Sequence, residues 1–257
     1  MYREPAAGSR PLTLDVGDKR EMGYRRNRPG SSARNIADGI YLKRAGVALL
    51  GMLGLLLCLK LLPMFAGAGI GAMVVLILVI KVIAGTVESK AQAYRREERK
   101  AERGARAEEN VDEVLRTLEG EYDVFHDVDT GHGDIDHVVL SKEHGVFVIE
   151  TKSHVGEVTV RNGVLLVDGE PPEKDFIAQT LRNTMWLKQR IRETTGLDPW
   201  IQPVIVFTRA FVREWKPVRG ILLRNQKYLV EAIEKTRTNQ EITSRLWSLH
   251  EQGKELW

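Results

Sequence analysis

Cysteine is almost absent from this 257-residue chain, and acidic residues are missing from one long stretch of it. The only cysteine, Cys58, excludes an intrachain disulfide, which fits a domain that faces a reducing cytoplasm. Between Ala45 and Gly85 there is no Asp or Glu, and the only charges are Lys60 and Lys81. Soluble helices seldom lack a polar face, so these absences disfavour a buried helix pair and favour membrane insertion.

The apolar stretch is long enough for two membrane spans, because one span needs about 20 apolar residues. Pro63 divides it into predicted spans at residues 45–62 and 65–84. Lys43 and Arg44 precede the first span, and a further basic run follows the second. Positive flanks favour the cytoplasmic side. The sequence therefore predicts a multi-pass protein of the cell membrane with two spans, whose N-terminus and C-terminal domain both lie in the cytoplasm.

Charge divides the chain into two unequal regions. Residues 1–100 have nine more basic than acidic residues, whereas residues 101–257 have six more acidic than basic ones. The acidic region cannot attract nucleic acid by bulk charge, so any such affinity needs local groups or metal ions. Residues 1–40, rich in Gly, Arg, Pro and Ser, predict a disordered basic tail. We expect a charged linker helix at residues 86–104 and an α/β domain at residues 105–257.

Helical and strand patterns alternate in the C-terminal region. One apolar helical face contains Val111, Val114, Leu115 and Leu118 and ends at Gly120. Strands are predicted at residues 122–128, 134–141, 146–152, 157–161, 164–168 and 203–208 and near 218–223. A helix is predicted from about Asp175 to Thr194, where Gly196 stops it.

Charged side chains occur at the ends of two of these apolar strands. Alternate residues of a strand share a face. Asp136 and His137 are therefore expected on opposite faces of their strand, whereas Glu150 and Lys152 are expected on the same face of theirs. If the two strands pair as a hairpin, Asp136, Glu150 and Lys152 can converge. Such a cluster is costly unless it binds something. Carboxylate oxygens suit Mg²⁺ or Mn²⁺, which also accept phosphate oxygens.

The run from Gly133 to Lys152, GDIDHVVLSKEHGVFVIETK, resembles the PD-(D/E)xK nuclease superfamily and in particular the nuclease-related domain called NERD. Gly133 and Asp136–Val139 match the family pattern G-x-I/V-D-H-V-V, and Gly145–Lys152 matches G-V-F-V-I-E-T-K without a gap. The resemblance spans roughly residues 104–210. It implies an α/β, restriction-endonuclease-like core, a central mixed sheet flanked by helices, preceded here by a transmembrane helical hairpin.

The resemblance also implies roles for individual residues. Asp136 and Glu150 would ligate Mg²⁺ or Mn²⁺, and the backbone carbonyl of Thr151 would complete the metal site. Lys152 would position or activate the attacking water, or stabilise charge in the transition state. Gln179, on the helix after the strands, matches a family glutamine that could hydrogen-bond Lys152 or a substrate phosphate, and a purely structural role for it stays open.

A further acid is implied on the first helix. The family pattern G-x-x-G-E-x-x-V fits residues 104–111, with Ala107 in place of the second glycine, and it points to Glu108 as a catalytic residue. Helical geometry agrees, because Glu108 lies three residues before a valine of the buried face. Glu109 is expected to lie with Asp112 on the exposed face.

The function implied is that of a membrane-anchored nuclease hydrolysing phosphodiester bonds, with DNA favoured over RNA and with the lipid bilayer as a second partner. Two alternatives remain, a non-catalytic module that binds nucleic acid or protein at the membrane, and a two-span signalling protein whose domain serves assembly. Five of the six histidines fall within 29 residues. Their spacing fits neither C-x-x-C nor H-E-x-x-H, which disfavours a zinc hydrolase.

Overall fold

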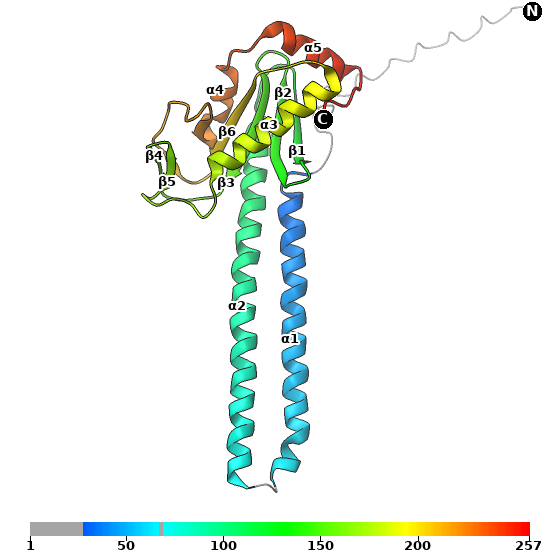
Figure 1. Ribbon diagram of the computed structural model, residues 1–257, viewed down its shortest axis with the longest axis vertical. Coiled ribbons are helices and arrows are strands. Elements are labelled where there is room, and N and C mark those ends of the chain that lie inside the picture. Colours follow the sequence, from blue (N-terminus) through cyan, green and yellow to red (C-terminus); the bar gives the residue numbers. More distant parts are fainter. Residues whose placement is uncertain (1–27, 67–68) are drawn as a thin grey trace, which may run out of the picture.

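The computed structural model describes residues 28–66 and 69–257, which form a long helical hairpin and an α/β head (Figure 1). Helix α1 spans Ser31–Ala66 and helix α2 spans Ile70–Leu115. The two helices lie side by side and antiparallel, and the head lies at the end where α1 begins and α2 finishes. The hairpin therefore brings the first and last turns of two long helices to one junction with the head.

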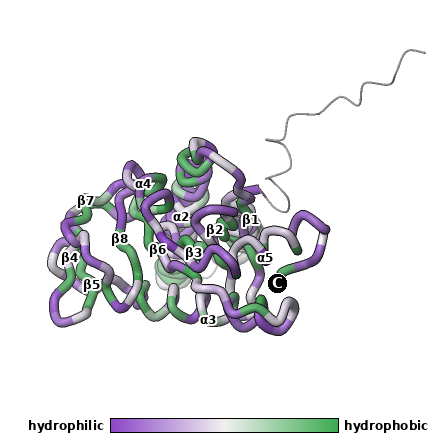
Figure 2. The backbone as a smooth tube through the Cα atoms, turned by 90° about the horizontal axis from the view of Figure 1, so that it is seen from above, coloured by the Kyte–Doolittle hydropathy of each residue, from purple (hydrophilic) through white to green (hydrophobic). Residues whose placement is uncertain are grey.

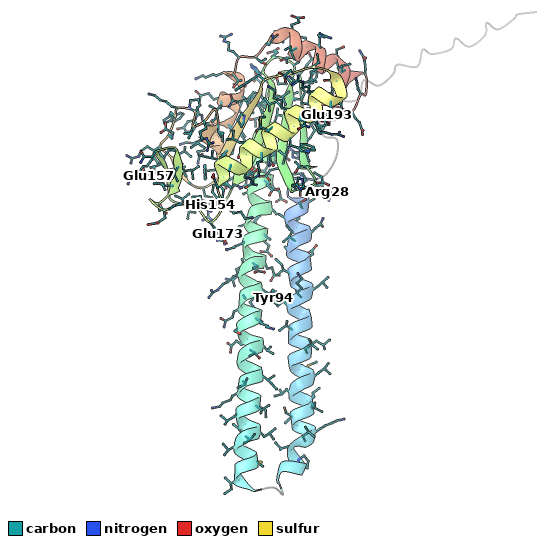
Figure 3. All side chains as sticks on the ribbon, viewed as in Figure 1. Arg28, Tyr94, His154, Glu157, Glu173 and Glu193 are labelled. Carbon is teal, nitrogen blue, oxygen red and sulfur yellow. The ribbon has the colours of Figure 1, made fainter. Side chains whose placement is uncertain are left out.

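The part of the hairpin farthest from the head is apolar and exposed. In each helix the most apolar window has only 6% of its residues buried. Leu50 is 69% exposed and Val82 is 65% exposed, and Figure 3 shows the hairpin side chains pointing outward along its length. Both helices are long and apolar enough to cross a membrane. A buried core pair would hide these side chains, and the hairpin does not.

Contacts between the two helices hold the hairpin together along its length. Gly51 lies so close to Val87 that a Cβ at Gly51 would come within 2.7 Å of a Val87 methyl carbon. Nearer the head, Arg44 forms an ion pair with Glu98. Small residues let the backbones of membrane helices approach closely, and ion pairs suit the polar part of a helix pair. The hairpin is thus held by close packing in its apolar part and by an ion pair in its polar part, nearer the head.

The predicted disordered tail is wrong for residues 31–40, which belong to α1; residues 1–27 of that tail lie outside the described residues. The physical reason is that a residue far along the chain, Asp127, caps the start of this helix. The Asp127 carboxylate accepts hydrogen bonds from the backbone N–H groups of Ser31, at 3.0 Å, and Ser32, at 3.4 Å. Unpaired N–H groups at a helix start need such an acceptor. A local sequence pattern cannot reveal a partner 96 residues away.

The helix boundaries also differ from the predicted ones. Pro63 lies inside α1 instead of ending it, and the helix continues for three more residues to Ala66. Residues 86–104, predicted as a separate linker helix, are the middle of α2, which runs without interruption into the head. The first apolar helical face ends at Leu115, with Arg116 as its cap, before Gly120 is reached.

The head is built on a mixed sheet. Its strands are β1 (Tyr122–Asp129), β2 (Asp134–Ser141), β3 (Gly145–Lys152), β6 (Ile201–Phe207) and β8 (Leu222–Asn225), in the order β1-β2-β3-β6-β8. Strands β1, β2 and β3 pair antiparallel, whereas β3, β6 and β8 pair parallel. The parallel pairing of β3 with β6 requires a crossover, which α3 (Phe176–Thr195) supplies. The carboxyl ends of β3, β6 and β8 therefore meet at one edge.

Helices cover both faces of this sheet. Helix α3 begins at the Asp175 cap and ends at Gly196, as predicted, and it packs with α5 (Gln240–Glu251) on one face. The end of α2 and the short α4 (Leu229–Glu234) cover the other face. Figure 2, a view from above, shows the apolar strands between these helices. The head is thus a mixed α/β fold with a central sheet flanked by helices.

A smaller sheet lies beside the main one. It contains β4 (Glu157–Arg161), β5 (Val164–Val167) and β7 (Phe211–Val212), in the order β5-β4-β7. The β4–β5 hairpin turns at Asn162 and Gly163, both with positive φ, as the Asn-Gly pair predicts. Its inner face packs on Phe176 and Phe207, so it braces the start of α3 against β6.

We expect Phe147→Ala to lower the free energy of unfolding of the head by about 3–5 kcal/mol, because it removes a buried ring from the core. Phe147 is fully buried, whereas Phe211 is 64% exposed and serves as the matched control, with an expected change within about 0.5 kcal/mol. All five tryptophans of the chain lie in residues 186–257. Denaturant unfolding of the full chain in detergent, followed by tryptophan emission, therefore reports the head. Equal effects of the two variants would contradict the assigned core.

Candidate functional site

The predicted strand pairing is confirmed. Strand β2 pairs with β3 so that His137 lies opposite Ile149, which places Asp136 and Glu150 at the next opposed positions. Val138 and Val148 face the α3 side of the sheet, and Phe147 and Ile149 face the α2 side. Alternation along β3 then brings Glu150 and Lys152 to the α3 side, and Asp136 of the neighbouring strand reaches them through its hydrogen bond with the Thr151 N–H. The three residues selected from the sequence lie at one end of two adjacent strands.

Glu150 is a buried carboxylate, 2% exposed, at the end of an apolar strand. Its Oε1 accepts hydrogen bonds from Lys152 Nζ and from Gln179 Nε2, both at 2.6 Å. Its Oε2 accepts a longer one from Asn183 Nδ2 at 3.4 Å. A buried charge is tolerated when it is paired and hydrogen-bonded. Three side chains, two of them from α3, therefore hold this carboxylate in place.

The ammonium group of Lys152, the ion-pair partner of Glu150, is also fixed by several contacts. Its side chain is only 13% exposed, and Nζ lies 4.7 Å from the centre of the Phe176 ring. Gln179 Oε1 is 3.5 Å from the same nitrogen. An aromatic face and a carboxylate both stabilise a cation. Lys152 is thus a charge fixed between β3 and the first turn of α3.

Gln179 and Asn183 show how α3 serves the site. They are four residues apart and so share one face of the helix. Asn183 also donates to the backbone carbonyl of Asp134, at 3.5 Å, which links α3 to β2. The sequence patterns did not single out Asn183. Its spacing from Gln179 is the signal that could have found it.

Asp136 is half-buried and lies beside Glu150. Its Oδ2 accepts a hydrogen bond from the backbone N–H of Thr151 at 2.6 Å. Burial, and then the charges of Glu150 and Glu108, raise the pKa of Asp136 well above its ordinary value, although Lys152 and the Thr151 N–H act in the opposite direction. Asp136 is therefore disfavoured as an anion unless another positive charge is present.

Glu108, on α2, is close enough to these groups to interact with them electrostatically. Burial raises its pKa to about 8, and the charges of Asp127 and Glu150 add to this effect. The backbone N–H of Gly30 donates to its carboxylate and opposes the shift, as does the charge of Lys152. The structure thus brings a fourth charged residue, contributed by the first helix of the predicted domain, to the site.

The expectation that Asp112 is exposed is wrong. Asp112 is 2% exposed, because it lies four residues after Glu108 and so faces the same side of α2. Its carboxylate is bound by Arg116, at 2.9 and 3.1 Å, and lies 3.2 Å from Nε2 of His126. Burial by itself would raise the pKa of Asp112, but the hydrogen bonds and charges of His126 and Arg116 together outweigh it, so its pKa lies below the ordinary value.

His126 and His137 continue this buried network across β1 and β2. Their Nδ1 atoms are 2.9 Å apart, and His137 is fully buried. Burial, and then the nearby His126, lower the pKa of His137 to about 3, so the ring is neutral near pH 7. His154 lies elsewhere, against the Phe176 ring at 5.1 Å between centroids. The clustered histidines thus separate into a buried network and surface positions.

The side chains of the site fit a divalent cation by charge. Glu108, Asp136 and Glu150 are three carboxylates near one ammonium, and burial, with the charge of Glu150 adding to it, raises the pKa of the first two. In the described residues, no group of three His, Cys, Asp or Glu side chains is arranged to hold an ion. Mg²⁺ needs only one or two protein carboxylates, because water and phosphate oxygens complete its shell. Asp136, Glu150 and the Thr151 carbonyl remain the candidate ligands.

Glu108→Gln should change how the stability of the metal-free head depends on pH. The folded pKa of about 8 lies above the ordinary 4.5, so between these values the folded state holds a proton that the unfolded chain has lost. The stability that this proton contributes is fully present below about pH 4.5 and is lost as the pH rises through about 8. The variant should therefore gain in melting temperature relative to wild type as the pH rises from 5 to 8.

Thermal unfolding of the full chain in detergent with a chelator, followed by tryptophan emission at several pH values, measures this difference. Glu113→Gln, on an exposed position of the same helix, is the matched control. Parallel pH profiles for wild type and Glu108→Gln would show that Glu108 is not perturbed.

Comparison with known proteins identifies the domain to which these residues belong. Residues 103–208 match the family model for the nuclease-related domain, NERD, close to the range of 104–210 that the motifs predicted. The match covers the end of α2, strands β1 to β6 and α3. No curated protein and no solved structure matches the chain. Residues 103–208 of this chain are therefore similar to the nuclease-related domain family.

Proposed function

We propose that this chain is a membrane-anchored, metal-dependent nuclease that hydrolyses phosphodiester bonds of nucleic acid, with DNA as its favoured substrate. The observation that supports this most directly is the convergence of Asp136, Glu150 and Lys152 within the nuclease-related domain. Glu108 adds a third carboxylate from α2. Strands β2 and β3 and helix α2 thus contribute carboxylates and one cation, and α3 contributes the amide groups that hold Glu150.

The chemistry divides between a cation and the side chains of the protein. A bound Mg²⁺ or Mn²⁺ would supply the Lewis acidity that activates water and neutralises phosphate charge. Lys152 is suited to stabilising negative charge as it develops on the phosphate oxygens, because its ammonium is already fixed. Gln179 and Asn183 hold Glu150 in one orientation. Preorganised groups of this kind do not have to reorient during the reaction.

Membrane anchoring is the second part of the proposal. The exposed apolar parts of α1 and α2 support it, since they have no protein surface to cover them in the described residues. Basic residues flank both outer ends of the apolar stretch. The positive-inside rule then places the N-terminus and the head in the cytoplasm of the cell. We propose that the nuclease acts beside the inner surface of the cell membrane.

A non-catalytic binding module is the alternative, and one observation favours it. Glu150 is already satisfied by Lys152, Gln179 and Asn183 without a metal ion. A nuclease fold that retains such a self-contained cluster could hold nucleic acid or a protein at the membrane without cleaving it. Cleavage measurements separate the two functions.

The full chain in detergent should cleave labelled oligonucleotides with Mg²⁺ or Mn²⁺ and stop when a chelator is added. Glu150→Gln should lower the rate by at least about 100-fold, because a preorganised charge at the reacting centre is lost. Glu193→Gln, on an exposed stretch of α3, is the matched control and should leave the rate unchanged. Single- and double-stranded DNA and RNA, tested in parallel, decide the substrate.

Tryptophan emission establishes that each variant is folded. Binding without cleavage by wild type, surviving Asp136→Ala and Lys152→Ala, would favour the binding module and exclude the nuclease. Cleavage that is equal in wild type and Glu150→Gln would remove Glu150 from the mechanism.

Topology can be measured with single-cysteine variants, because Cys58 is the only native thiol. In a Cys58→Ser background, Ile70→Cys at the exposed start of α2 should react with a membrane-impermeant maleimide on intact cells. Glu193→Cys on the head should react only after the cells are broken. The reverse pattern would place the head outside, and reaction of both in intact cells would exclude the predicted hairpin.

A further inference from the structure

The start of α1 is bound to acidic residues that adjoin the candidate site. Besides the backbone contacts of the Asp127 cap, the Ser31 hydroxyl donates to Asp127 Oδ2 at 2.5 Å. The Ser32 hydroxyl donates to Asp134 Oδ2 at 2.6 Å. Figure 3 shows Arg28 at this junction, where α1 meets the head. Helix α1 is thus attached to both β1 and β2 by side chains that a simple helix cap does not require.

Gly30 fixes this junction against α2. It is buried, its φ is +73°, and a Cβ on it would come within 2.9 Å of the Cα and carbonyl oxygen of Ala105. Those are backbone atoms, which cannot move aside easily. Ala105 lies three residues before Glu108 on the same helix. Close backbone packing therefore sets the distance between the start of α1 and the turn of α2 that contains Glu108.

Two chains of contacts connect this junction to the site. Gly30 packs on the backbone of Ala105, about one helical turn before Glu108. The Ser32 hydroxyl binds Asp134, whose backbone carbonyl accepts from Asn183, and Asn183 also reaches Glu150. Asp127, which receives three hydrogen bonds from Ser31 and Ser32, is one of the charges that act on Glu108. The junction therefore touches the site from two sides.

We propose that Gly30, Ser31 and Ser32 are positioning residues of the nuclease site, so that the first turn of α1 holds Glu108 and the start of β2 in their working geometry. This inference rests on the proposed nuclease function and goes beyond it, because these residues lie outside the nuclease-related domain. The helix that leads into the membrane is then part of the enzyme and not only its anchor. Outer contacts that orient metal-binding groups affect metal affinity and activity by about 10–100-fold when they are removed.

The experiment uses the full chain in detergent, with Mn²⁺ binding measured by electron paramagnetic resonance and cleavage measured as kcat and KM. Gly30→Ala, and separately Ser31→Ala with Ser32→Ala, should weaken Mn²⁺ binding or lower kcat by about 10–100-fold. KM for the oligonucleotide should stay within about twofold of wild type, because these residues are not assigned to substrate binding. Ser31→Thr with Ser32→Thr should restore most of the loss, since threonine retains the hydroxyl donor.

Matched controls lie on the same two helices. Gly39→Ala tests a glycine of α1 whose Cβ would meet no atom within 4 Å. Ser89→Ala removes an exposed hydroxyl of α2 that bonds only within its own helix. Both should leave Mn²⁺ binding and kcat unchanged. Tryptophan emission establishes that the head of each variant is folded, and a variant that unfolds is replaced by the other of the two test variants.

Variants of Gly30 and the two serines that bind Mn²⁺ and cleave like wild type would overturn the inference and leave the nuclease function intact. Increased cleavage by these variants would also overturn it, because the junction would then be inhibitory. A wild-type chain that neither binds Mn²⁺ nor cleaves would overturn the proposed function and this inference together.

Discussion

The carboxylate of Glu150, buried at the end of an otherwise apolar strand, is the interaction on which the arrangement of the head depends. Removing such a charge from water costs several kcal/mol unless partners compensate. Lys152 supplies the opposite charge, and Gln179 and Asn183 supply hydrogen bonds. The last two belong to α3, so the carboxylate is satisfied only when α3 lies across the sheet in one position.

Core packing and the site therefore impose the same requirement on α3. Leu187 and Ile191 of this helix are buried against the sheet, about one to three turns beyond the residues that bind Glu150. The Asp175 cap fixes where the helix begins. The crossover between parallel strands β3 and β6 then directs α3 over the ends of β2 and β3. Apolar burial supplies the stability, and the polar groups at the start of the helix select its register.

Helix α2 runs as one uninterrupted helix from the apolar part of the hairpin to the candidate site. Its polar stretch of residues 88–104 is about 25 Å long at 1.5 Å per residue, which holds the head at a distance from the apolar segment. Its last turns contribute Glu108 to the site, Asp112 to the buried histidine network, and Leu115 to the core. A single rigid element thus sets the position of the head relative to the hairpin and supplies one of the site acids.

The amino-acid sequence by itself determined the elements that depend on local patterns. Alternation along β3 placed Glu150 and Lys152 on one side, the predicted pairing of β2 with β3 brought Asp136 close to them, and the gapless motif indicated the nuclease-related domain. The absence of acidic residues and the long apolar runs between Ala45 and Gly85 marked two helices long enough to cross a membrane. These features are readable because side-chain direction in a strand and apolar length in a helix depend only on neighbouring residues.

Tertiary structure alone decided what depends on partners distant in the chain. The start of α1 at Ser31 needs the Asp127 carboxylate, and the burial of Asp112 needs His126. In isolation, residues 31–40 read as a polar tail and Asp112 as an exposed charge. Residues 31–40 are helical because Asp127, about 100 residues away, caps them. Asp112 is buried because His126, 14 residues away, binds it. No local pattern encodes a hydrogen bond that exists only after the sheet has formed.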